Sequence, residues 1–135
     1  MTAQIVYLGD LRTQATHIQS NTTHETDAPV DNQGKGERFS PTDMVAASLG
    51  SCMLTIMGIA ARTHDIDIVN TKLDIEKIMI ADPLRRIKEI KVDFHFPPGI
   101  EYSDKEKIIL EKAALTCPVN LSLHENVIRT INFNW

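Results

Sequence analysis

Two cysteines carry the most reactive side chains of this sequence, and they lie far apart along the chain. Cys52 stands in the middle of "SPTDMVAASLGSCMLTIMGIAAR" (residues 40–62), a stretch of mostly small and apolar residues. Cys117 directly precedes a proline in "CPVNLSL". In a reducing compartment cysteines normally remain thiols. The sequence therefore favours two free thiols, or a pair that cycles between thiol and disulfide, over a permanent structural disulfide.

Each thiol has a structural interpretation beside the chemical one. Free cysteine is among the most buried residue types, so Cys52 could simply fill space in a core. Cys117 is placed to act as the N-cap of a helix that begins at Pro118. At such a position the free backbone N–H groups and the helix dipole favour a thiolate. Helix position alone therefore nominates Cys117 as the more reactive thiol, although it could also be a cap without chemistry.

Residues 40–62 are predicted to form one long helix. Ser40 suits the N-cap, Pro41 the first helical position, and Asp43 the positive end of the helix dipole. The apolar residues point in every direction around the axis, which predicts a helix buried on all sides. A chain of this length can hardly enclose such a helix alone. We therefore expect an intertwined homodimer in which the partner covers part of it.

The other predicted elements are mostly strands. Residues 4–8 and 11–18 form a hairpin around Gly9, and a third strand follows at 22–26. A loop over 27–39 leads into the helix. Alternating patterns predict a second hairpin around "DPLRR", and Ser103 with Glu106 forms a capping box for a second helix. The chain closes with a strand from Ile128 to Trp135. This order predicts one α+β domain spanning residues 1–135.

Composition excludes several classes of partner. The chain is 42% hydrophobic and 24% charged, and its net charge of -4 comes without a run of Lys or Arg, so neither nucleic acid nor a membrane is expected. We expect no apolar run long enough to span a bilayer, and the start "MTAQIVYLGD" does not resemble a signal peptide, which predicts a cytoplasmic protein. Phosphate-binding glycine motifs and zinc-type histidine spacings are absent. We therefore expect no cofactor and no metal.

Several of these features together resemble one family. A Gly-rich loop, "SPTD", a small-residue helix with "LGSC" and a downstream "CPVNLSL" are similar to the OsmC/Ohr family, which comprises osmotically inducible protein C and the organic hydroperoxide resistance proteins. The resemblance covers nearly the whole chain and is strongest to the OsmC-like branch. It implies antiparallel sheets around long central helices in an intertwined homodimer, with both active sites at the subunit interface.

The resemblance also implies a thiol peroxidase that acts on small organic hydroperoxides. Cys52 would attack the hydroperoxide and become a sulfenic acid, and Cys117 would condense with it to a disulfide. A dithiol or a lipoylated protein would then reduce that disulfide. The alternative is a non-catalytic homodimer that binds a small molecule in an apolar pocket, with lining candidates Met44, Met53 and Met57.

The family further implies an arginine, held by a glutamate, beside the peroxidatic sulfur. The candidates are Arg38, in the loop before the helix, and Arg12, in the first hairpin; Arg38 is favoured slightly because its loop leads directly into the Cys52 helix. Matching the helix-start proline to that of the founders' Asn-Pro-Glu motif puts Thr42 at the glutamate position. Asp43 lies one place further, about 100° around the helix. Asp43 would hold the arginine, or it would only stabilise the helix start while Glu37 takes its place, or the arginine would lack a holder and peroxidase activity would be weak.

Overall fold

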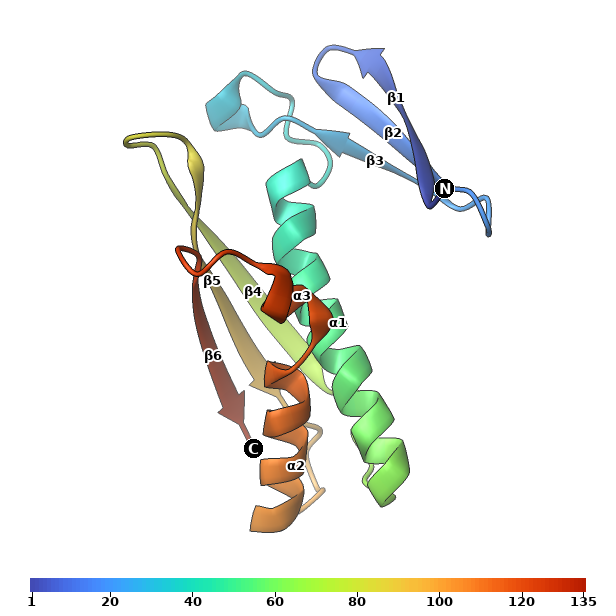
Figure 1. Cartoon of the computed structure of the whole chain (residues 1–135), viewed down its shortest axis with the longest axis vertical. Helices are drawn as coiled ribbons and strands as arrows, with labels where there is room; N and C mark the ends of the chain where they lie inside the picture. The colour runs from blue at the N-terminus through green and yellow to red at the C-terminus, as the bar shows by residue number, and fades with distance from the viewer. The chain divides into compact units, whose positions relative to one another are not determined.

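The structure, a computed structural model, describes every residue from Met1 to Trp135. The contacts divide the chain into two compact units, Met1–Val45 and Ala46–Trp135, which are described separately (Figure 1). Each unit contains one three-stranded sheet, and three α-helices accompany them, which confirms the α+β class. That the two units form a single domain stays a prediction.

The N-terminal unit contains an antiparallel sheet of order β1-β2-β3. Its strands are β1 (Ala3–Gly9), β2 (Arg12–His17) and β3 (Thr23–Asp27). The β1–β2 turn carries positive φ angles at Gly9, Asp10 and Leu11, and glycine adopts such angles without a Cβ penalty. The register between β2 and β3 places Arg12 opposite Asp27. These two residues are distant in the sequence, and strand pairing makes them neighbours.

A folded-back loop follows β3 and contains the short 3-10 helix η1 (Val30–Asn32). A Cβ added at Gly34 would overlap the backbone of Ala28, so only glycine fits there. The close approach lets the N–H of Gly36 donate to the carbonyl of Ala28 at 3.3 Å. One residue later, the N–H of Glu37 donates to Asp27 Oδ2 at 3.1 Å. The loop therefore returns Glu37 to the end of β3.

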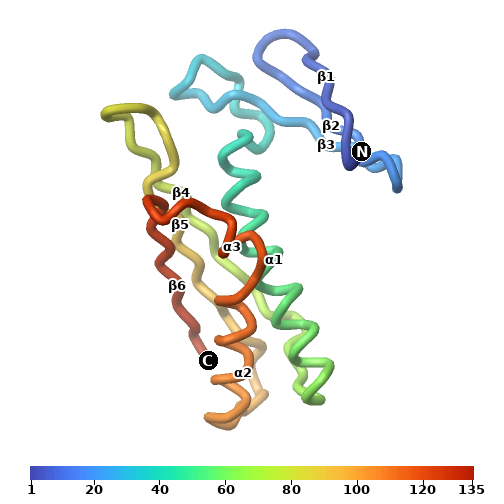
Figure 2. The backbone as a smooth tube through the Cα atoms, in the orientation of Figure 1, coloured from blue at the N-terminus to red at the C-terminus, as the bar shows by residue number.

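The C-terminal unit contains a mixed sheet of order β4-β5-β6. Strand β4 (Lys72–Ile80) pairs antiparallel with β5 (Arg86–His95), whereas β6 (Ile128–Asn134) pairs parallel with β5. The expectation of antiparallel sheets is therefore wrong for this last pair. Its physical reason is the crossover between β5 and β6, which carries α2 (Asp104–Leu115) and α3 (Pro118–Ser122), as the tube in Figure 2 shows. The predicted Ser103–Glu106 capping box of α2 is confirmed.

One face of this sheet forms the core. Ile90, Val92 and Phe94 alternate along β5 and are fully buried, and α2 contributes Leu110 and Ala114 to the same cluster. The other face is polar: Lys91 pairs with Glu76 at 2.9 Å, and His95 with Asp74 at 2.9 Å. The helices of this unit therefore cover a single apolar sheet face.

The long helix α1 (Pro41–His64) begins as predicted. The N–H of Asp43 donates to Ser40 Oγ at 3.1 Å, and Asp43 Oδ2 accepts from the N–H of Ser40 at 2.8 Å. Within the single chain its buried residues follow one stripe and Ile59 is 57% exposed, so one chain alone does not bury the helix on all sides, and a partner that covers the rest stays a prediction. The buried stripe comprises Ala46, Leu49, Gly50, Met53, Met57 and Ala61.

By length and composition alone, α1 could also cross a membrane. The expectation that no apolar run approaches that length is therefore wrong. One such helix is weak evidence for a membrane span, because the core helix of a soluble protein has the same length and hydropathy. The stripe of fully buried residues along α1 is typical of such a core helix.

The contact between Gly34 and Ala28 yields a stability prediction. Gly34→Ala should lower the free energy of unfolding by more than about 1 kcal/mol, because the added methyl group meets backbone that cannot move aside without displacing the loop. Urea denaturation measures the change. Lys35→Ala is the matched control, since its exposed ion pair with Asp10 at 3.3 Å contributes little. Equal stability of both variants would show that the loop adapts freely.

Candidate functional site

The two cysteines of the C-terminal unit are both free thiols. Cys52 lies on α1, is partly buried and packs against the core, whereas Cys117 has no exposed surface at all. Although 64 residues separate them in sequence, the two side chains are near enough for Cys52 to contribute to the raised pKa of the Cys117 thiol. The two thiols that the sequence analysis singled out therefore lie in the same unit and influence one another, without being bonded.

Cys117 sits in the sharp connection between α2 and α3. It is the N-cap of α3, as predicted, and its Sγ accepts a hydrogen bond from the N–H of Asn120 at 3.3 Å. Pro118 takes the first helical position, where its missing N–H costs nothing. The side-chain amide of Asn120 donates to the carbonyl of Leu115 at 2.7 Å. Residues that precede and follow Cys117 in the sequence therefore fix the conformation of this connection.

Burial dominates the acid–base behaviour of Cys117. Removal from water raises the pKa of its thiol above the ordinary value, and the interaction with the Cys52 side chain raises it further. The N–H groups of Asn120 and Val119 lower the pKa of Cys117 without reversing the shift. The inference from helix position, that the cap favours a thiolate at Cys117, is therefore wrong in direction, because it ignored desolvation.

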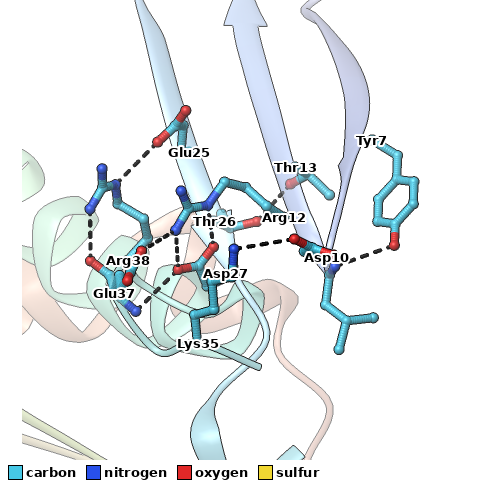
Figure 3. Close-up of polar contacts among 11 residues, drawn as sticks. Tyr7, Asp10, Arg12, Thr13, Glu25, Thr26, Asp27, Lys35, Glu37 and Arg38 are labelled. Atoms are coloured by element: carbon cyan, nitrogen blue, oxygen red, sulfur yellow. Dashed lines mark hydrogen bonds and ion pairs between the residues drawn. The ribbon is translucent and has the colours of Figure 1, made fainter. Parts of the chain in front are cut away.

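A charged cluster in the N-terminal unit surrounds Arg12 (Figure 3). Its Nε donates to Asp27 Oδ1 at 2.6 Å and its Nη2 to Asp27 Oδ2 at 2.8 Å, a bidentate pair. The same Nη2 also reaches Glu37 Oε2 at 2.7 Å. The two carboxylates raise the pKa of Arg12 further above its already high value. Arg12 is therefore a permanently charged group in a fixed orientation.

Asp27 is the member of this cluster that sequence reasoning missed. Its side chain is only 2% exposed, and the hydrogen bonds from Arg12 hold its pKa below the ordinary 3.8. It was placed in the loop after the third strand, where an aspartate suggests a turn. The signal was available in the strand register, because a hairpin that starts at Arg12 returns to Asp27 at the same level of the sheet.

The other candidate residues are engaged differently. Arg38, about half exposed, donates from Nε to Glu25 Oε2 at 3.1 Å and from Nη1 to the carbonyl of Glu37 at 3.1 Å. Asp43 caps its own helix through Ser40. Arg12 thus has a bidentate, buried carboxylate partner in Asp27, and Glu37, one of the two predicted acids, also contacts it.

The arginines and the thiols lie in different units of the chain. Arg12, Arg38 and Asp43 belong to residues 1–45, and both cysteines belong to residues 46–135. No group of three or more His, Cys, Asp or Glu side chains is arranged to hold a metal ion. Met53 and Met57 are fully buried in the core, so they do not line an open pocket in the single chain.

The comparisons with known proteins place this chain in a family. The model of the OsmC-like protein family matches residues 34–132, which include both cysteines. The chain therefore belongs to the OsmC-like family, as its motifs suggested. No curated protein matches it significantly.

Solved structures agree with this assignment. A Psychrobacter arcticus protein, provisionally named an osmotic stress induced and detoxification response protein, is 50% identical, with a TM-score of 0.93 and coverage of 99% of this chain and 96% of that one. An organic hydroperoxide resistance protein OsmC from Legionella pneumophila is 16% identical, with a TM-score of 0.77 and coverage of 100% and 98%. The OsmC-like protein of Mycoplasma pneumoniae is 18% identical, with a TM-score of 0.77 and coverage of 98% and 94%. The second and third similarities show the fold.

The buried pair of Arg12 and Asp27 predicts a pH dependence. Because the folded-state pKa of Asp27 lies below 3.8, its contribution to stability is complete above about pH 4 and disappears as the pH falls through the lower folded value. Asp27→Asn should therefore be less stable than the wild type near neutral pH, and the difference should shrink below about pH 4. Urea denaturation across this range measures it.

The control for this prediction is Asp10→Asn, which removes an exposed carboxylate paired with Lys35. It should change the stability little at any pH, because exposed ion pairs contribute little. A difference between wild type and Asp27→Asn that stays constant with pH would contradict an ionic role for Asp27.

Proposed function

We propose that this protein reduces organic hydroperoxides through the thiols of Cys52 and Cys117. The observation that carries the proposal is that two free thiols from distant parts of the chain lie in one unit, with Cys52 near enough to contribute to the raised pKa of Cys117. A disulfide-forming reaction requires two such thiols, and because they are not bonded in this structure, the two sulfurs must approach one another for the bond to form. The family supports the reaction class, since its members of known fold include organic hydroperoxide resistance proteins.

In the first step Cys52 is the attacking group. It is the less buried of the two thiols, so a small hydroperoxide reaches it more easily than Cys117. The Cys52 thiolate attacks the terminal oxygen, the O–O bond breaks, and the alkoxide takes a proton and leaves as an alcohol. Cys52 is then a sulfenic acid, oxidised by two electrons.

In the second step Cys117 resolves this intermediate. Its sulfur attacks the Cys52 sulfur, the S–O bond breaks, and the hydroxide leaves as water with the thiol proton of Cys117. The product is a Cys52–Cys117 disulfide, and a dithiol, either a small molecule or a lipoylated protein, returns it to two thiols. A cytoplasmic location would provide such reductants.

The activating cation in this proposal is Arg12. A partly buried thiol needs a nearby positive charge to react as a thiolate near neutral pH. Arg12 is held by Asp27 and Glu37, whereas Arg38 is about half exposed, so Arg12 has the fixed orientation that activation requires. Asp43, engaged in capping α1, would then support the helix rather than the arginine.

An intertwined homodimer completes the proposal. Strand β1 exposes consecutive apolar side chains, and α1 leaves Ile59 57% exposed, which a monomer would not be expected to keep in water. A second copy that covers these faces would share one core with the first. The exposed apolar residues of β1 are Ile5, Val6, Tyr7 and Leu8.

Thiol titration tests the reaction. One equivalent of cumene hydroperoxide should remove two thiols per chain from the wild type, because both sulfurs enter one disulfide. Cys117→Ser should lose one thiol and accumulate a sulfenic acid that dimedone traps, and Cys52→Ser should lose none. The reverse pattern would make Cys117 the attacking group. No thiol loss in the wild type would favour the non-catalytic, ligand-binding alternative.

A second experiment tests the choice of arginine. The double variant Arg12→Met/Asp27→Asn removes the ion pair without leaving a buried carboxylate unpaired. It should slow alkylation of Cys52 in the Cys117→Ser background at neutral pH by about tenfold. The reason is that a nearby cation typically lowers the pKa of a thiol by about one unit or more. Arg38→Met is the matched control and should leave the rate nearly unchanged.

Light scattering should show the same dimeric mass for both arginine variants, so that a slower rate reports activation and not dissociation. If Arg38→Met alone slows the reaction, the loop arginine is the activating group and Arg12 is structural.

A further inference from the structure

Asn120 makes two hydrogen bonds that enclose Cys117. Its backbone N–H donates to Cys117 Sγ at 3.3 Å, and its side-chain Nδ2 donates to the carbonyl of Leu115 at 2.7 Å. Leu115 ends α2 and Asn120 lies in α3, so the side chain ties the two helices together across the cysteine. The same residue therefore contacts both the sulfur of Cys117 and the end of α2.

The remaining polar atom of this side chain is unsatisfied. Asn120 Oδ1 is buried and has no hydrogen-bond partner in the structure. A buried acceptor without a donor destabilises a protein. The helix α3 buries none of its own residues, so this cost is not offset by a local core. Stability alone therefore does not explain an asparagine at position 120. Its contact with Cys117 is the feature that could explain it.

We propose that Asn120 is a positioning residue for Cys117, which holds its own backbone N–H against the sulfur during disulfide formation. The inference rests on the proposed function for the role of Cys117, and the contact itself is present whatever the reaction. Nothing in the family similarity assigns a role to this asparagine.

The chemistry of resolution requires such a donor. As Cys117 attacks the Cys52 sulfenic acid, its S–H proton moves to the departing hydroxyl, which leaves as water, and negative charge develops on the Cys117 sulfur before the S–S bond is complete. Burial opposes that charge, and the N–H groups of Asn120 and Val119 stabilise it. Cys52, on α1, is the titratable group whose interaction with Cys117 contributes to this balance.

The experiment uses the Cys52→Ser protein, in which Cys117 is the single thiol and its ionisation is read from thiolate ultraviolet absorbance as a function of pH. Adding Asn120→Ala should lower the thiolate fraction at a fixed pH by about tenfold, as expected when a charge-assisted hydrogen bond loosens. Asn120→Gln, which keeps an amide that can reach the Leu115 carbonyl, should restore most of the fraction.

Ser122→Ala is the matched control, because it removes one side-chain bond to backbone in the same helix, from Oγ to the carbonyl of Pro118 at 2.8 Å. It should leave the Cys117 titration unchanged. Thermal melts should show that Asn120→Ala costs little stability, since the substitution also removes the unsatisfied oxygen. If Asn120→Ala does not melt cooperatively, Asn120→Ser replaces it, because serine is too short to reach Leu115. An unchanged titration in the folded variant, or a shift equal to that of Ser122→Ala, would overturn the inference.

A second measurement links the contact to the reaction. With both cysteines present, Asn120→Ala should consume the first equivalent of cumene hydroperoxide at the wild-type rate but show a sulfenic acid that dimedone traps for about tenfold longer. A wild type that consumes no hydroperoxide would refute the proposed function, whereas the titration of the single-thiol protein would still decide the role of Asn120.

Discussion

The interaction between the side chains of Cys52 and Cys117 depends on two helices that pack on the same sheet face from distant parts of the chain. On α1, Gly50 lies two residues before Cys52, and a Cβ at this position would come within 2.8 Å of Ile75 Cδ1 and 3.1 Å of Leu73 Cδ1. The helix therefore lies closer to β4 there than a larger residue would allow. On the other side, α2 buries Leu110 and Ala114 before the chain turns into Cys117. Core packing therefore positions both segments that carry the cysteines.

In the N-terminal unit, the main structural feature is the fixed orientation of the otherwise flexible Arg12 side chain. An arginine side chain loses much conformational freedom when it is held in place. The bidentate ion pair with Asp27 offsets part of this entropy cost. Glu37 supplies a second carboxylate that limits the remaining rotation of the guanidinium group. This arrangement requires a tight loop, since Glu37 reaches Arg12 only because the chain folds back at Gly34. The close backbone approach at Gly34 thus shapes the turn and also places Glu37 beside Arg12.

Local features of both units could be predicted from the sequence, and long-range ones could not. The capping box of Ser103 and Glu106 and the N-cap at Cys117 involve residues within one helical turn, so residue type and spacing determine them. The parallel pairing of β6 with β5 involves residues separated by both α2 and α3, and periodicity gives no information on direction. Asp27 was missed for the same reason, because its partner is set by strand register. The reactivity of Cys117 was misjudged because burial, which sequence shows poorly, outweighs the helix terminus.

In the proposed reaction, burial would give the two thiols different chemical roles. A thiol with a raised pKa stays protonated near neutral pH, and so Cys117 would retain the proton that the leaving hydroxyl needs in the proposed disulfide step. Were Cys117 a permanent thiolate, it would compete for hydroperoxide and could be oxidised at a position with no exposed surface, where a protein reductant has no direct access. The N–H donors around its sulfur need only lower the cost of charge during the transfer, not abolish it. In the proposed mechanism, a buried, protonated resolving thiol and a more accessible attacking thiol would order the two steps by physical access rather than by a difference in residue type.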